Sequence, residues 1–462
     1  MRQKADEDKG DHFSLTREET RMRRLFLFSM AVAALSFGLV VNLDPRAIAQ
    51  QSAPGAGKTY VQAGTLIAVP GEPAQTRKTI IIENGRISAI RDGFVEERGG
   101  AVIDLRAKTV LPGLIDSHVH LLNETGPSQR LDVVTKSEAD FAVEGYANAL
   151  KNLRAGFTTV ADLGAGNGDD AIFAIRDSIR AGKLIGPRIL AAGSTVTPTG
   201  GHGDIQGYRD DVMEVLGRAS TCNGADDCRR AVREQVRAGA DVIKITATGG
   251  VLSNIAAGTE QQFFDDELVA IVETARQLGR KVTAHAHGVT GVNAALRAGV
   301  ASIEHGTFLD AESIRLFKEK GAVLVPTVLA GRFVENEAKT GTWMTPAQRA
   351  KALDVGPRML DMLRRAKAGG VTIAFGTDTG VSKHGDNAQE FGLWIEAGFT
   401  PPEALRAATI GAATHLGIAA ETGSISVGKA ADIIAVDGDP LRDVGVLLDV
   451  DFVMARGVVA KE

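Results

Sequence analysis

The middle of the chain alternates strand-like and helix-like segments, and this alternation restricts the fold more than any other feature of the sequence. The strand-like runs cover residues 112–119, 157–164, 187–193, 241–248, 281–288, 301–306, 322–328 and 371–378. Helical patterns lie between them, for example at 136–156, 265–279 and 345–370. Strands that alternate with helices favour a parallel sheet of the α/β class, and eight such units predict a (β/α)8 TIM barrel.

An open, doubly wound sheet is the alternative arrangement of the same elements. That fold would place a Gly-x-Gly-x-x-Gly turn after its first strand, whereas the first strand here ends in His118-Val119-His120. The 53 glycines also suit a fold with many tight turns between strands and helices. We therefore expect the barrel.

Both ends of the chain are rich in short β-like runs that Gly, Pro and Asn-Gly interrupt. Residues 57–110 contain KTIIIENGRISAIRDG, and residues 421–462 contain KAADIIAVDGD. This pattern is typical of hairpins in a small sheet domain. We expect the two ends to build one small β-sandwich, with the barrel of residues 111–420 inserted between them.

Residues 1–49 have the features of a secretory signal peptide. A basic cluster at 21–24 precedes the apolar stretch 25–41, and small residues follow at Ala47 and Ala49. This order predicts cleavage near Ala49, and a periplasmic or secreted protein without membrane contact after cleavage. An uncleaved anchor is the alternative, because 25–41 is about the shortest stretch that could span a bilayer.

Three smaller observations bear on location and partners. Met22 is an alternative start of the chain. Cys222 and Cys228 are close enough to form a small disulfide in an oxidising compartment, the alternative being two free thiols. The net charge of -5 and the pI near 6.1 leave no basic footprint for nucleic acid.

His118 and His120 stand at the end of the first barrel strand. Alternation along a strand puts both side chains on one face, where two imidazoles could share a metal ion. A pair of buried, internally satisfied core histidines is the alternative for this motif alone.

Other polar residues interrupt the predicted strands at matching places, which favours the metal site. They are Lys244 in the fourth strand, His285 and His287 at the end of the fifth, His305 in the sixth and Asp378 at the end of the eighth. Functional groups of a barrel lie at the carboxyl ends of its strands. Together with His118 and His120, this set suits two divalent cations.

Lys244 needs a separate explanation, because a protonated lysine cannot ligate a metal. A neutral buried amine can react with carbon dioxide to form an anionic carbamate, which could bridge two cations. A lysine paired with a neighbouring carboxylate such as Asp241 is the alternative.

Several motifs together resemble the metal-dependent amidohydrolase superfamily in its binuclear form with a carboxylated lysine. They are DSHVH, DVIKITATGG, VTAHAHG, SIEHGTF and FGTDTG, and the closing GSISVGKAADIIAVDGDP resembles the tail of that superfamily. TPTGGHGD and TATGGVLSN are similar to its exported imidazolonepropionase-like branch, which includes Xaa-Pro dipeptidases, carboxypeptidase-like enzymes and ochratoxin-hydrolysing amidohydrolases.

The resemblance implies a role for each motif residue. His118, His120 and Asp378 would hold the more buried ion, His285 and His305 the more exposed one, and carboxylated Lys244 would bridge both ions. Either His285 or His287 could be the ligand from the fifth strand, and the resemblance favours His285 and places His287 beside the substrate. Zinc is the expected metal, although these ligands also accept manganese and cobalt.

The resemblance further implies hydrolysis of an amide bond by a metal-activated hydroxide, with Asp378 as the catalytic proton carrier. The expected substrates are dipeptides, N-acyl amino acids or ochratoxin-like amides, and a homo-oligomer such as an octamer is the expected assembly. His202, Tyr208 and His384 are candidate substrate contacts, the alternative being an ordinary polar rim. Arg332, after the seventh strand, could pair with a substrate carboxylate, the alternative being a lone surface arginine. Other possible functions are a cyclic amidase, an imidazolonepropionase-type or lactone hydrolase and, outside enzymes, a non-catalytic ligand-binding barrel.

Overall fold

The computed structural model describes residues 57–164, 169–216, 220–254 and 258–462. The predicted signal peptide at 1–49 and the alternative start at Met22 lie outside the described residues. Among the helices of the described residues, none is long and apolar enough to cross a membrane.

The predicted alternation of strands and helices is confirmed, and each of the strand-like runs contains one observed parallel strand. The strands are β5 (Leu114–Val119), β6 (Phe157–Asp162), β7 (Arg188–Ala191), β8 (Ile243–Thr246), β9 (Val282–Ala286), β10 (Ser302–His305), β11 (Val323–Val325) and β12 (Thr372–Ile373). They form a three-stranded sheet, β5-β6-β7, and a five-stranded sheet, β12-β11-β10-β9-β8. The middle of the chain is therefore an α/β fold with parallel strands.

Backbone contacts continue from each of these sheets to the other. Beyond β7, Val196 forms a bridge with Ile245 of β8. On the other side, Val119 of β5 forms a bridge with Thr379, which follows β12, and the amide of Asp378 donates to the carbonyl of His118 over 2.7 Å. The ends of β7 and β8 are thus adjacent, and so are the ends of β5 and β12, although β5 and β12 are far apart in the sequence.

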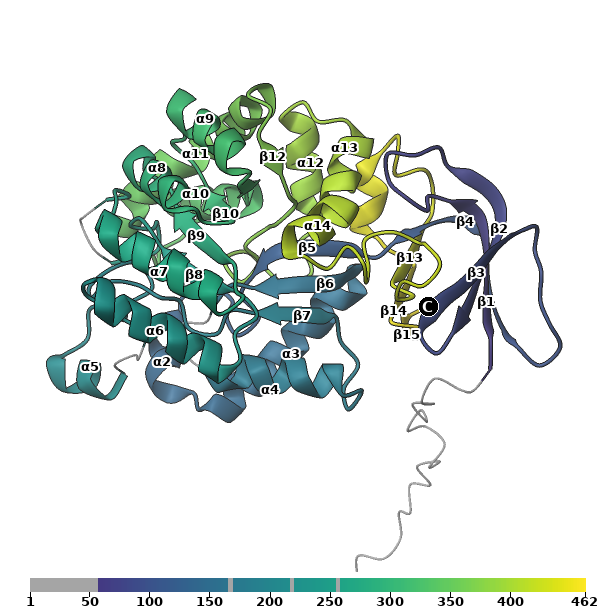
Figure 1. Cartoon of the computed structure of the whole chain (residues 1–462), viewed down its shortest axis with the longest axis horizontal. Coiled ribbons are helices and arrows are strands. Elements are labelled where there is room, and N and C mark those ends of the chain that lie inside the picture. The colour runs from purple at the N-terminus through teal and green to yellow at the C-terminus, as the bar shows by residue number, and fades with distance from the viewer. Residues whose placement is uncertain (1–56, 165–168, 217–219, 255–257) are drawn as a thin grey trace, which may run out of the picture. The chain divides into compact units, whose positions relative to one another are not determined.

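Helices lie around the outside of the parallel strands (Figure 1). They are α2 (Gln129–Thr135), α3 (Glu138–Arg154), α4 (Asp169–Arg180), α5 (Asp210–Leu216), α6 (Ala225–Ala238), α7 (Asp265–Gln277), α8 (Val289–Ala298), α9 (Ala311–Lys320), α10 (Val328–Thr340), α11 (Pro346–Ala368), α12 (Gln389–Glu396), α13 (Pro401–Arg406) and α14 (Ala412–Leu416). Local sequence fixes several of their starts. Ser137 and Asp140 form a capping box at α3, and Thr345 with Pro346 begins α11. The main hydrophobic core fills the space between these helices and the strands.

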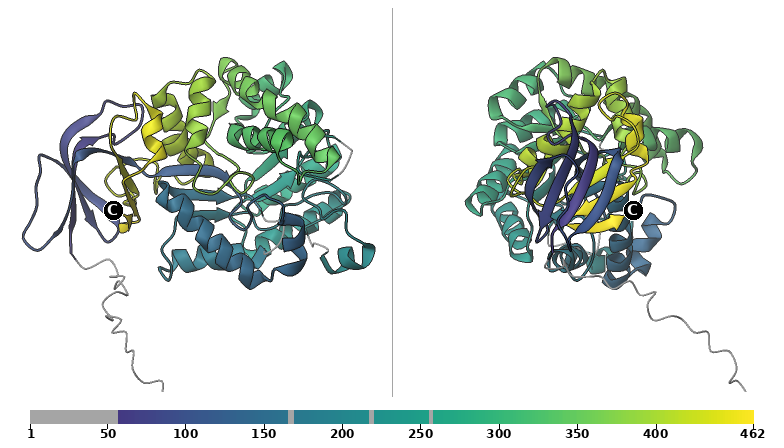
Figure 2. Two further views of the ribbon diagram at one scale, coloured as in Figure 1. Left: turned by 180° about the vertical axis from the view of Figure 1, so that it is seen from behind. Right: turned by 90° about the vertical axis from the view of Figure 1, so that its right-hand side faces the viewer.

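The two ends of the chain meet in one seven-stranded sheet, seen beside the helical part in Figure 2. Its strands are β1 (Thr59–Leu66), β2 (Gln75–Glu83), β3 (Arg86–Asp92), β4 (Ala101–Pro112), β13 (Ile433–Val436), β14 (Phe452–Ala455) and β15 (Val458–Lys461), in the order β15-β14-β13-β4-β1-β2-β3. Strands from the two ends thus lie in one sheet, whereas the sequence predicted a sandwich. The reason is that β13 pairs directly with β4, with Ile434 opposite Leu111, and so continues the N-terminal sheet.

Cys222 and Cys228 form a disulfide, with their Cα atoms 4.9 Å apart. Both side chains are buried in the main core, next to the start of α6. Of the two alternatives that the sequence leaves open for this pair, the structure thus has the disulfide.

Candidate metal centre

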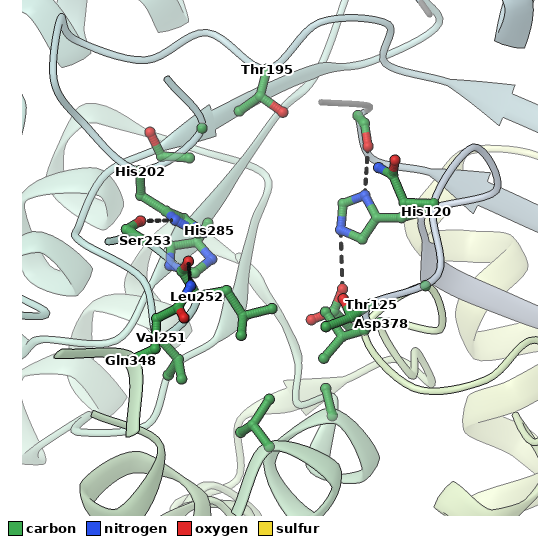
Figure 3. Close-up of a pocket in the computed structure, with 18 of the residues that line it drawn as sticks. His120, Thr125, Thr195, His202, Val251, Leu252, Ser253, His285, Gln348 and Asp378 are labelled. Atoms are coloured by element: carbon green, nitrogen blue, oxygen red, sulfur yellow. Dashed lines mark hydrogen bonds and ion pairs between the residues drawn. The ribbon is translucent and has the colours of Figure 1, made fainter. Parts of the chain in front are cut away.

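The residues at the strand ends converge on one cavity of about 330 Å³. The lining includes all of the predicted metal ligands and His287, namely His118, His120, Lys244, His285, His287, His305 and Asp378. Figure 3 shows His120 and Asp378 on one side of this cavity and His285, with His202 beside it, on the other. The structure therefore brings together side chains that lie far apart in the sequence. The largest separation among the predicted ligands, 260 residues, is that between His118 and Asp378.

The first ligand cluster consists of His118, His120 and Asp378. The two Nε2 atoms are 3.3 Å apart, and Asp378 Oδ1 lies 3.5 Å from Nε2 of His118 and 3.0 Å from Nε2 of His120. Within the described part of the chain, no donor is hydrogen-bonded to the buried Oδ1 of Asp378. Three potential ligand atoms thus face one point.

Hydrogen bonds on the far side of each ring show that this point suits a cation. His120 Nδ1 lies 2.5 Å from the carbonyl oxygen of Gly164, which can only accept, so Nδ1 carries the proton. His118 Nδ1 lies 2.8 Å from Oε2 of the buried Glu304, which fixes the same tautomer. Both Nε2 lone pairs then point at each other and at Asp378, an arrangement that a shared divalent ion would stabilise.

The second ligand cluster consists of His285, His287 and His305. Their potential ligand atoms all lie within 4.8 Å of one another, and the ring centroids of His285 and His305 are 4.6 Å apart. Nδ1 of His287 contacts the hydroxyl of Thr307 over 2.8 Å, and Nδ1 of His305 contacts that of Thr327 over 2.7 Å. These contacts leave both Nε2 atoms free for a ligand.

Burial favours the neutral imidazoles that bind metals. It lowers the pKa of His285 and of His305 well below the usual value, and it lowers the pKa of His287 to about 3. His120 differs, since burial lowers its pKa but the carboxylate of Asp378 raises it by more. The same pairing acts on Asp378, where burial raises the pKa and the neighbouring His118 and His120 more than reverse this shift.

Lys244 projects from β8 into the cavity and contacts the first cluster. Its Nζ lies 3.4 Å from Nε2 of His118, and the side chain is buried. Burial lowers the pKa of this amine, which favours its neutral form. Asp241, the alternative partner, forms an ion pair with Arg176 at 2.8 Å. Among the described residues, Lys244 thus forms no ion pair and lies as a buried amine against His118.

Sequence reasoning missed Glu304, because side chains alternate along a regular strand. Alternation puts Glu304 and His305 on opposite faces, yet Glu304 hydrogen-bonds to His118, and the ring of His305 lies 5.3 Å from that of His118. His305 has a φ of +72°, which ends the regular strand and redirects its side chain. The signal was present in the SIEH motif, where a carboxylate adjoins a histidine in a buried strand.

Asp116, which opens the DSHVH motif, was also missed. Its carboxylate accepts hydrogen bonds from the amide of His118 at 3.1 Å, the hydroxyl of Thr377 at 2.6 Å and the side-chain amide of Asn387 at 2.7 Å. It thereby ties the strand that carries His118 to the segment that carries Asp378.

Three of the five predicted substrate contacts line the cavity, His287 among them, and two do not. His202 and Tyr208 belong to the lining. His384 lies outside it, because its ring nitrogens contact the side chain of Asn152 and the carbonyl of Asn123. Arg332 also lies outside, because its side chain points from helix α10 to Glu396 at 3.6 Å.

His202 is held tightly at the wall of the cavity. Its Nδ1 lies 2.5 Å from the hydroxyl of Ser253, and its backbone amide donates to Gln262 over 2.8 Å. The ring stands 4.2 Å from that of His285 and packs against Gly250, where a Cβ atom would lie only 2.4 Å away. The site therefore requires glycine at position 250.

The remaining lining divides into an apolar wall and a polar rim. Apolar side chains come from the loop after β8 and from helices α10 and α11; they are Val251, Leu252, Ala330, Val334, Val355 and Met359. On the rim, the guanidinium of Arg130 lies 5.4 Å from the ring centroid of Tyr208. Arg130 is an exposed cation that the sequence did not single out.

The fold has parallel strands with histidine, carboxylate and lysine side chains gathered at their ends. This arrangement is typical of enzymes that bind metal ions at the ends of their strands. The pattern of the amidohydrolase family matches residues 109–460. This chain therefore belongs to the amidohydrolase family and is a hydrolase that acts on amide bonds.

Individual relatives agree with this membership. Ochratoxinase from Aspergillus niger is 33% identical over 432 residues, which cover 88% of this chain and 86% of that protein. The crystal structure of a Xaa-Pro dipeptidase with methionine bound in its active site is similar with a TM-score of 0.82 and 40% identity, over 88% of this chain and all of the other. The crystal structure of A. niger ochratoxinase gives a TM-score of 0.76 at 30% identity, over 88% and 96% of the two chains.

Proposed function

We propose that this protein is a binuclear metal-dependent amidohydrolase that cleaves the amide bond of dipeptides, N-acyl amino acids or ochratoxin-like amides. The observation that carries the proposal is the convergence of two ligand clusters and the buried Lys244 on one cavity. The proposal includes a closed (β/α)8 barrel, which the bridges Val196–Ile245 and Val119–Thr379 support.

In this proposal His118, His120 and Asp378 hold one ion, and His285 and His305 hold the other, with zinc as the first candidate. His287 faces the substrate; its Nδ1 contact with Thr307 leaves Nε2 free for this role. As a carbamate, Lys244 would supply ligand oxygens to both ions. Its neutral amine attacks carbon dioxide, a C–N bond forms and one proton leaves, and the lowered pKa of Lys244 supports this step.

The two ions, when bound, would make a water molecule acidic and polarise the carbonyl group under attack. Asp378 takes the proton of the attacking water on its carboxylate and passes it to the leaving nitrogen, so that a carboxylic acid and an amine are formed. Glu304 and Gly164 keep His118 and His120 in the tautomers that ligation requires.

The cavity lining supports a substrate with an apolar group and an anionic end. Leu252, Val334 and Met359 offer a wall for an apolar side chain. Arg130 on the rim carries a fixed positive charge that can pair with a substrate carboxylate. Arg130 thus takes the role that the sequence led us to expect of Arg332.

The test is metal analysis of the purified protein, followed by a screen of dipeptides and N-acyl amino acids. We expect two divalent ions per chain and hydrolysis of substrates with a free carboxylate, which chelator abolishes and added zinc restores. Fewer than two ions, or turnover that survives complete metal removal, would refute the binuclear mechanism.

We also propose that the protein is exported by an N-terminal signal peptide at residues 1–49. The disulfide between Cys222 and Cys228 supports this proposal, because such bonds persist in oxidising compartments. N-terminal sequencing of the mature protein from the native host tests it. A first residue close to position 50 is expected, and an intact N-terminus would contradict cleavage.

A further inference from the structure

Helix α10 begins in an unusual way directly beside the second ligand cluster. Its N-cap residue is Thr327, a residue type whose hydroxyl commonly accepts a hydrogen bond from the first turn of its own helix. Here the Thr327 side chain makes no such cap. Its Oγ1 lies 2.7 Å from Nδ1 of His305 instead.

Glu390 of helix α12 supplies the missing cap from elsewhere in the chain. Its Oε1 accepts from the amide of Val328 at 3.1 Å, and its Oε2 accepts from the amide of Leu329 at 2.6 Å. The indole of Trp394 donates to the same carboxylate over 2.9 Å. Glu390, Trp394 and Thr327 are fully buried, and Glu390 does not line the cavity.

We propose that Glu390 is a positioning residue for the second metal site, because it caps α10 and so leaves the Thr327 hydroxyl free to orient His305. This inference rests on the proposed metal centre. Without an acceptor from Glu390, the first amides of α10 are unsatisfied, and the nearest alternative acceptor is the hydroxyl of Thr327. If that hydroxyl turned to the helix, His305 Nδ1 would lose its partner and the ring its fixed orientation.

Glu390→Gln and Thr327→Val are the test variants. The glutamine replaces one carboxylate oxygen by a donor, which faces a backbone or indole N–H in either orientation. The valine keeps the shape of threonine and removes only the hydroxyl. Glu267→Gln is the matched control, because the buried Glu267 also accepts from two backbone amides, those of Gly224 and Phe264, but lies outside the cavity lining.

The measurement is the affinity for zinc of the full chain, depleted of metal and titrated calorimetrically. We expect Thr327→Val and Glu390→Gln each to weaken one of two zinc sites about 10- to 100-fold, the usual effect of removing a hydrogen-bond partner of a ligating histidine. The double variant should bind zinc no more weakly than Thr327→Val alone, since both changes act through one hydroxyl. Glu267→Gln should keep both wild-type affinities even if its melting temperature falls.

Three results would overturn the inference. Equal zinc affinities in Glu390→Gln and Glu267→Gln would show that Glu390 is a helix cap without influence on the site. Fully additive losses in the double variant would show that it does not act through Thr327. If Glu390→Gln does not fold, wild-type affinity in Thr327→Val would refute the inference equally. Failure of the wild-type protein to bind two ions is a separate result, because it refutes the proposed metal centre itself.

Discussion

Gly250→Ala should disable the site without changing any polar group. A Cβ atom at this position would lie 2.4 Å from Cε1 and Nε2 of His202, whereas ordinary van der Waals contact begins at 3.4 Å. The ring must therefore move by about 1 Å, the difference between these distances. Such a shift stretches the 2.5 Å contact between His202 and Ser253, or it displaces the loop that carries Leu252. A misplacement of about 1 Å at a substrate-positioning group can cost about 100-fold in rate.

The assay is the determination of kcat and KM with the best N-acyl amino acid from the substrate screen. We expect kcat/KM to fall about 100-fold in Gly250→Ala and by a similar factor in His202→Ala, with two zinc ions retained. Gly392→Ala is the matched control, because its new methyl group meets no atom within 4 Å. The reasoning fails if Gly250→Ala keeps wild-type kcat/KM while His202→Ala loses it. It also fails if both variants are fully active, since His202 then has no part in substrate binding.

Four further changes test other parts of the site. Asp378→Asn should lower kcat by about 10²- to 10⁴-fold while metal analysis still finds zinc, and an active variant would exclude the proton-carrying role. Lys244→Ala should lose activity and regain part of it when a short-chain carboxylic acid such as propionate replaces the carbamate; a complete lack of rescue would argue against carboxylation. Arg130→Gln should raise KM about tenfold for an N-acyl amino acid but not for its carboxamide, and Arg209→Gln, also exposed, should change neither. Burial lowers the pKa of His384 to about 4, so its neutral form stabilises the fold at pH above 6.5, and this contribution is lost as pH falls towards 4. In wild-type protein this loss lowers the free energy of unfolding by up to about 3 kcal/mol between pH 6.5 and 4, and urea unfolding of His384→Gln should lack it. The same pH dependence in both proteins would refute this role of His384.

The sequence predicted those parts of the molecule that depend on local periodicity. Strand-like runs and the polar residues at their ends located each parallel strand and each member of the two candidate ligand clusters. Arg332 follows the strand-like run 322–328, which predicted a place at the strand end, whereas α10 already begins within that run at Val328 and its Arg332 points to Glu396. The hydrogen bonds that cap the start of α10 come from Glu390, which lies 62 residues after Val328. Local sequence patterns do not predict a contact over this separation.

Three positions at the site depart from regular backbone geometry, so alternation along a strand could not predict where their side chains point. His305, Thr327 and Asp378 have φ values of +72°, +49° and +61°, a region that non-glycine residues rarely adopt. Each such residue costs on the order of 1–3 kcal/mol, which the surrounding structure must offset. The offsets are visible, since the amide of Asp378 donates to the carbonyl of His118 and the hydroxyl of Thr327 contacts His305.

These three strained residues have one effect in common, because each helps to orient a side chain of the candidate metal centre. A regular strand end points a side chain in or out, but it cannot turn a carboxylate towards two histidines of another strand. The positive φ at Asp378 directs its carboxylate towards the two histidines of the first cluster. The positive φ at His305 directs its ring towards the other histidines of the second cluster. Thr327 holds the latter in place only because another residue caps its helix. Buried hydrogen bonds from residues outside the cavity therefore stabilise the strained backbone of the site. A substitution that removes one of these hydrogen bonds should weaken metal binding, as the loss of a ligand would.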